Sequence, residues 1–138
     1  KQVVYVACDH LDREVEGLGS ATIRRQGLGK GMEADAWFFI DRFGGDPAVE
    51  APDLAIEVEV SQSALDKLPI LEAIEVPELW RTDLARVRIF RLCEGSYREV
   101  ERSEILPLSA ENLTLLLNLR ATVSRKAWTK RLRELLGG

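Results

Sequence analysis

The clearest hydrophobic pattern in the chain is a strict alternation over residues 53–60. The polar and small residues take one set of alternate positions: Asp53, Ala55, Glu57 and Glu59. Leucine, isoleucine and valine take the other set. Successive side chains of a strand point to opposite faces. The pattern therefore predicts a strand that has one apolar face and three carboxylates on the other.

Other apolar patterns predict the rest of the fold. Helical spacing predicts helices over residues 1–11, 61–74, 110–119 and 124–136, the third of them capped by Ser109. Runs rich in β-branched and aromatic residues predict strands over residues 22–26, 35–41, 78–82, 86–92 and 97–102. We expect Gly17 and Gly19 to break the chain, and the glycine-rich residues 27–31 to form a turn. The order indicates an α/β (α+β) fold with a central mixed β-sheet flanked by helices.

Proline 69 complicates the helix expected after the alternating strand. Either the helix begins near Leu68, which places Pro69 in its first turn, or the helix kinks at the proline. We expect residues 1–138 to form a single domain, with the helices of residues 109–138 at its C-terminal end. The chain does not begin with Met, so the prediction allows for a missing N-terminal element.

Composition narrows the possible classes of protein. The 138 residues are 46% hydrophobic and 30% charged, as in ordinary globular proteins, and no apolar run is long enough to span a membrane. Two distant cysteines, Cys8 and Cys93, and the single His10 argue against a zinc site. The two cysteines form either a disulfide or, as we favour, two buried thiols in a reducing cytoplasm. The net charge of −4 argues against a polycationic coat protein but is compatible with a nuclease.

Positive charge is concentrated at the C-terminal end of the chain. From Arg120 onward there are six Lys or Arg residues and one Glu. Five of them lie on the last predicted helix: Arg125, Lys126, Lys130, Arg131 and Arg133. Two interpretations remain open: a solvated helix face, which we favour, and contact with phosphates.

The carboxylates of the alternating strand need an explanation, because an isolated ionised carboxylate in a covered sheet is costly. They are solvated, if that face meets water, or they are paired or bound to metal. A strand rises about 3.3 Å per residue, so Asp53 and Glu57 lie about 13 Å apart and cannot share an ion. A partner for Glu57 should come from an adjacent strand, which Asp35 opens. Oxygen ligands of this kind suit Mg²⁺ or Mn²⁺. Lys67, in the following helix, is either solvated or placed to neutralise charge on a phosphate.

Four segments resemble one family of proteins. They are GKGMEADAWFFI at residues 29–40, APDLAIEVEVS at residues 51–61, LDKLPI at residues 65–70 and VPELWR at residues 76–81. In this order they resemble the Uma-type family of bacterial endonucleases, in the PD-(D/E)xK restriction-endonuclease-like superfamily. The resemblance spans roughly residues 17–102. It implies a restriction-endonuclease-like core, a DNA substrate and a Mg²⁺ or Mn²⁺ cofactor. Because cutting two strands needs two centres, it also implies a homodimer.

The resemblance also implies roles for individual residues. Asp35 matches the motif aspartate, in an Ala-Asp context, and Glu57 matches the glutamate of the (D/E)xK motif; these two would bind the metal. Glu59 stands where the superfamily has its lysine, and Lys67 matches the lysine that the family carries on the next helix. Asp35, Glu57, Glu59 and Lys67 are therefore the predicted catalytic residues. The glutamate at position 59 also supports an alternative function, a catalytically degenerate nuclease-fold module that binds nucleic acid or protein.

Overall fold

A mixed β-sheet forms the centre of the computed structural model, which describes residues 1–19, 22–23, 32–33, 36–47, 49–59 and 68–137. Within these residues the sheet has six strands in the order β1-β4-β5-β6-β7-β8. Their bounds are Val15–Gly19, Ala36–Ile40, Leu54–Val58, Glu78–Thr82, Val87–Cys93 and Ser96–Val100. β5 and β6 pair in parallel, and the other pairings in the described part of this sheet are antiparallel. Two short strands, β2 (Thr22–Ile23) and β3 (Met32–Glu33), pair separately.

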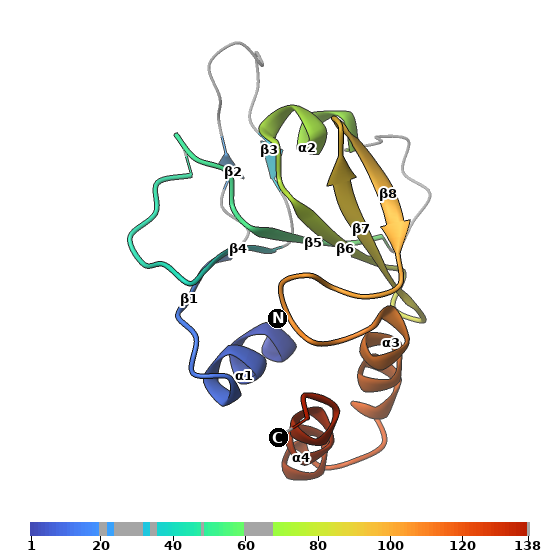
Figure 1. The fold of residues 1–138 in the computed structure, drawn as a ribbon. Coiled ribbons are helices and arrows are strands. Elements are labelled where there is room, and N and C mark those ends of the chain that lie inside the picture. Colours follow the sequence, from blue (N-terminus) through green and yellow to red (C-terminus); the bar gives the residue numbers. More distant parts are fainter. Residues whose placement is uncertain (20–21, 24–31, 34–35, 48, 60–67, 138) are drawn as a thin grey trace.

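Helices cover both faces of the sheet (Figure 1). One face packs against α1 (Gln2–His10), α3 (Ala110–Leu119) and α4 (Arg125–Leu135), and α2 (Leu68–Ile74) lies on the other. Odd and even positions of the strands divide between two cores, as the alternation predicts. Phe38, Leu54 and Trp80 belong to the core beneath α1, α3 and α4, whereas Trp37 and Ala55 belong to the core beneath α2. This architecture is the predicted mixed sheet flanked by helices.

Elements specified by local signals have the predicted bounds. Strand β6 covers residues 78–82, and α3 covers residues 110–119. Ser109 caps α3 in a capping box, because its side chain accepts a hydrogen bond from the Asn112 N–H while the Asn112 side chain accepts from the Ser109 N–H. The described part of α2 covers residues 68–74. The residues before it lie outside the described part of the chain, so both alternatives for Pro69 stay open.

The prediction that Gly17 and Gly19 break the chain is wrong. Both residues lie in β1, which pairs antiparallel with β4. A glycine is needed at position 17 because an added Cβ would stand 1.8 Å from the Tyr5 hydroxyl oxygen and 3.3 Å from Phe38. Close approach of another side chain, and not a turn, therefore accounts for this glycine. The predicted turn at residues 27–31 lies outside the described residues.

Two further expectations concern membranes and thiols. Over the described part of the chain, no helix is both long and apolar enough to cross a bilayer. Cys8 and Cys93 are free cysteines. Cys8 lies on the buried side of α1, and this burial raises the pKa of its thiol, which favours the protonated form.

Candidate active site

The most buried acid on the α2 side of the sheet is Glu57. It is the fourth residue of β5, and its side chain points to the same face as that of Ala55, which lies in the core beneath α2. Only 3% of Glu57 is exposed to solvent. The interpretation that the acidic face of this strand meets water is therefore wrong at position 57. Two residues further along, Glu59 is exposed.

A basic residue on the neighbouring strand accompanies these acids. In the parallel register of β5 and β6, Glu57 is the partner of Arg81, so the two side chains share a face. The Arg81 guanidinium Nη2 lies 2.9 Å from Glu59 Oε1. The Arg81 side chain is 18% exposed and that of Glu59 is 48% exposed. A mostly buried guanidinium beside a buried carboxylate offsets part of the desolvation cost of each.

The backbone keeps this end of the sheet in register. Beyond the last residue of β5, the Glu59 N–H donates to the Thr82 carbonyl oxygen at 2.7 Å. The parallel pairing therefore continues through position 59. On the other side of β6, Arg81 is the antiparallel partner of Arg88, which is exposed. Three neighbouring strands thus carry charged groups at this end of the sheet: the buried Glu57 on β5, Arg81 on β6 in its ion pair with Glu59, and Arg88 on β7.

Two of the four predicted catalytic residues, Asp35 and Lys67, lie outside the described residues. Their neighbours in sequence are described. Asp35 directly precedes Ala36, whose antiparallel partner on β5 is Ile56, the residue before Glu57. Lys67 directly precedes Leu68, the first residue of α2, which packs over the same face of the sheet as Glu57.

The described residues supply a partial donor set for a divalent cation. The carboxylate oxygens of Glu57 are hard ligands of the type that Mg²⁺ and Mn²⁺ prefer. Glu59 offers a second carboxylate, which Arg81 engages. Within the described ranges, no three His, Cys, Asp or Glu residues are grouped to hold a metal ion. The described residues alone therefore do not make up such a group around Glu57.

With the site geometry in place, the chain can be compared with known proteins. The model of the Uma2 family, described as a putative restriction endonuclease, matches residues 4–124. The chain belongs to the Uma2 family. The match covers every strand of the sheet and ends one residue before α4. A search of curated proteins found no match. Membership confirms the resemblance and places the chain in a family of nucleases.

Sequence reasoning missed the role of Arg81 in this Uma2 chain, although it lies within the VPELWR segment. An arginine that directly follows a run of buried strand residues is a signal for an acidic partner. Its partner depends on the parallel register of β5 and β6, which no local pattern specifies. The sequence therefore indicates that a partner exists without showing which residue it is.

The other conspicuous acids have structural roles. Asp53 begins the alternating segment, and its Oδ2 accepts hydrogen bonds from the Ile40 N–H at 2.7 Å and from the Arg42 guanidinium at 3.2 Å. These bonds fasten the loop that follows β4. Glu78 is fully buried on the opposite face of β6 from Arg81, where it accepts hydrogen bonds from Trp80 and Ser103. Burial alone therefore does not identify the functional acid.

Proposed function

We propose that this Uma2 protein is a divalent-metal-dependent endonuclease that hydrolyses phosphodiester bonds of DNA. The observation that carries the proposal is a carboxylate, Glu57, which is 97% buried at the end of β5 beside Arg81 in a chain that the Uma2 family matches over residues 4–124. Its free cysteines fit the reducing cytoplasm, where such a protein meets DNA.

In this proposal Asp35 and Glu57 hold Mg²⁺ or Mn²⁺. A divalent ion supplies Lewis-acid polarisation of the phosphate and lowers the pKa of bound water. Lys67, which directly precedes Leu68 in the sequence, contributes positive charge toward the phosphate as negative charge develops. Glu59, held by Arg81, lies at the solvent side of Glu57 and helps to position water.

Cleavage of supercoiled plasmid in the presence of Mg²⁺ or Mn²⁺ tests this assignment. We expect Glu57→Gln, Asp35→Asn and Lys67→Ala each to lower the cleavage rate by about 100-fold or more, because each removes a group that acts on the reacting phosphate. Glu99→Gln is the matched control, since Glu99 is an exposed glutamate of β8 remote from β5. Its rate should equal that of the wild type.

Metal binding gives a second measurement that does not depend on cleavage. Titration with Mn²⁺, followed by electron paramagnetic resonance, should give a weaker Kd for Glu57→Gln than for Glu99→Gln. Cleavage at the wild-type rate by both the Glu57→Gln and the Lys67→Ala variants would contradict the proposal.

A homodimer on duplex DNA is part of the proposal, because cutting both strands needs two centres. Sedimentation with and without duplex DNA tests it.

One observation favours a second function, a non-catalytic nuclease-fold module. Position 59 holds a glutamate in an ion pair with Arg81 where the superfamily has its lysine. If this departure abolishes catalysis, wild-type protein binds DNA but cleaves none with either metal. In that case Glu57→Gln should leave the binding unchanged.

A further inference from the structure

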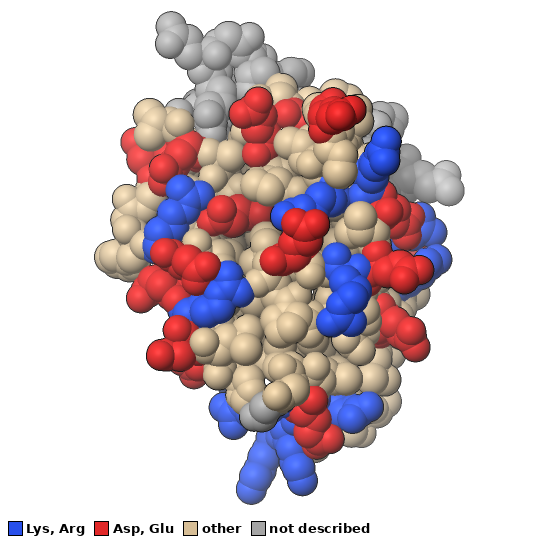
Figure 2. All heavy atoms as spheres, in the orientation of Figure 1, with Lys and Arg blue, Asp and Glu red and all other residues tan. Residues whose placement is uncertain are grey.

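The net charge of the chain hides a strong division between its two parts. Residues 120–138 hold six of the 19 Lys and Arg residues and one of the 23 Asp and Glu residues, a net charge of +5. Because the whole chain carries −4, residues 1–119 carry −9. In Figure 2, blue side chains project from the lower end of the molecule, where Figure 1 places α4. One end of an acidic protein is therefore strongly basic.

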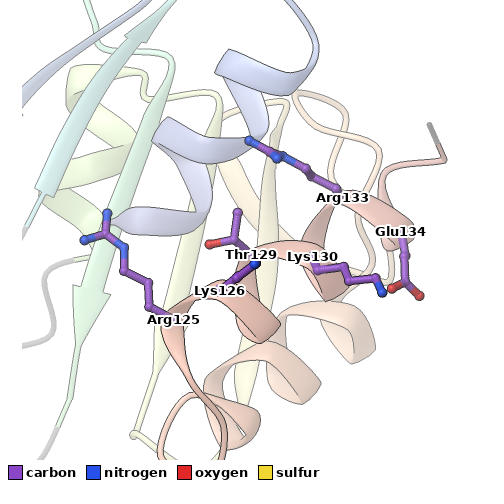
Figure 3. Close-up of a pocket in the computed structure, with 6 residues that line it drawn as sticks. All are labelled: Arg125, Lys126, Thr129, Lys130, Arg133 and Glu134. Carbon is purple, nitrogen blue, oxygen red and sulfur yellow. The ribbon is translucent and has the colours of Figure 1, made fainter.

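Four exposed residues of α4 form a basic stripe, which we define as Arg125, Lys126, Lys130 and Arg133. Lys126, Lys130 and Arg133 recur at helical spacing, so they lie along one side of the helix. With Thr129 and Glu134 they line an open hollow of about 750 Å³ (Figure 3). The helical spacing fixes only where these side chains leave the helix. In Figure 3 they fan out from there: Lys130 extends to the same side as Glu134, whereas Arg125 and Arg133 extend in other directions.

Within the described part of the chain, the basic stripe has one acidic residue in its hollow, Glu134. Glu134, the one acid of α4, forms an ion pair with Arg131, which lies outside the stripe. Among the described residues, no ion pair involves any member of the stripe. Arg125 and Lys126 also lie in the first turn, where the helix dipole disfavours cations. Like charges three and four residues apart destabilise a helix further. This arrangement favours an anionic ligand over a purely structural role.

The surroundings of the stripe indicate which anion it fits. The apolar residues of α4, Trp128 and Leu132, are buried in the core, so the helix exposes no apolar face that could enter a lipid bilayer. The stripe also lacks the aromatic or aliphatic anchors of a protein interface. From Lys126 to Arg133 the helix rises about 10 Å, a length over which one strand of DNA presents about three phosphates.

We infer that the basic stripe of α4 binds the phosphodiester backbone of nucleic acid, at a surface separate from Glu57. The stripe begins beyond the residues that the family matches. It also adjoins the end of the sheet that carries the candidate site, because Arg125 lines a second hollow together with Val58 and Thr82, the last residues of β5 and β6. This inference goes beyond the proposed function, since it requires neither metal nor cleavage.

The test measures the salt dependence of binding in EDTA, by fluorescence anisotropy of labelled duplex DNA. Each phosphate contact contributes about 0.9 to the slope of log Kd against log salt concentration. Lys126→Gln/Arg133→Gln should therefore reduce the slope by about 1.8. Between 50 and 200 mM salt, the wild type should lose about 12-fold more affinity than this variant. The matched control is Arg98→Gln/Arg102→Gln, which removes two exposed arginines in and just beyond the edge strand β8, outside the basic stripe.

Each outcome is decisive. A reduced slope in the α4 double variant, with a wild-type slope in the control and unchanged circular dichroism, supports the inference. Equal losses in both double variants would show an effect of overall charge and overturn it. It is also overturned if the wild type binds no DNA in EDTA, or binds phosphatidylserine vesicles instead. Salt-dependent binding without any cleavage would leave the stripe intact while the proposed function fails.

Discussion

The fully buried carboxylate of Glu78 should be a principal source of stability, and substituting it tests how the structure uses buried charge. Its Oε2 accepts hydrogen bonds from Trp80 Nε1 at 2.8 Å and from Ser103 Oγ at 2.5 Å. Its Oε1 accepts from the Glu104 N–H at 2.9 Å and lies 3.3 Å from Arg91 Nη1. Glu78 thus ties β6 to β7 and to the segment that leads into α3.

The magnitude follows from the donors that a substitution leaves unmatched. Glu78→Gln keeps the size of the side chain but replaces one acceptor oxygen with a donor NH₂. The Ser103 hydroxyl can rotate to accept from this amide, whereas the Trp80 N–H cannot, and an unsatisfied buried donor costs about 1–3 kcal/mol. Losing the charge opposite Arg91 adds roughly 1 kcal/mol. We therefore expect a loss of about 2–4 kcal/mol, a large part of the 5–15 kcal/mol typical of domains.

Urea unfolding followed by circular dichroism measures this loss. With a slope of about 2 kcal/mol/M, the midpoint of Glu78→Gln should fall by about 1–2 M. The matched control is Glu104→Gln, because Glu104 pairs with the same Arg91 but its side chain is 66% exposed. That change should cost less than about 1 kcal/mol. A midpoint for Glu78→Gln within the error of the wild type would refute the assignment of Glu78 as a structural carboxylate.

Two further substitutions test a close approach and a surface ion pair. Gly17→Ala places a Cβ against the Tyr5 hydroxyl and should push that ring from its edge contact with Phe38. The free energy of unfolding in urea should fall by about 1 kcal/mol. In a Tyr5→Ala background the same glycine substitution should lose most of this cost. The hydrogen bond from Arg13 lowers the pKa of Asp41 below 3.8. The ionised form is therefore favoured by folding, so Asp41→Asn should destabilise at pH 7, and the difference from the wild type should shrink as pH falls through the folded pKa of Asp41.

The elements that sequence patterns predicted well are those whose signals are local. Ser109 and the apolar spacing behind it specify where α3 begins, and a run of buried residues specifies β6. Gly17 shows the opposite case. A glycine is ordinarily evidence for a break in the chain, and only the Tyr5 side chain, twelve residues earlier, explains why a strand needs one there. Information of this kind depends on tertiary contact.

The candidate site divides in the same way. Alternation over β5 correctly placed Glu57 and Ala55 on one face, because strand periodicity is a property of the backbone. Arg81 could not be assigned as the neighbour of Glu57, since a one-residue change of register between β5 and β6 would move it to the other face. Glu78 is buried like Glu57, and its donors from Trp80 and from the segment at Ser103 identify it as structural.

The proposed function requires an acidic protein to bind DNA, and the separation of charge between the candidate site and α4 explains how it could do so. A body that carries −9 over residues 1–119 repels a phosphate backbone. At physiological salt, charges act over only about 8 Å, so the local charge of a surface and not the net charge decides where DNA associates. The basic stripe of α4 supplies such a surface on the face of the sheet away from Glu57. Association and chemistry would then depend on different residues, so substitutions at Lys126 and Arg133 should weaken binding while those at Glu57 remove cleavage.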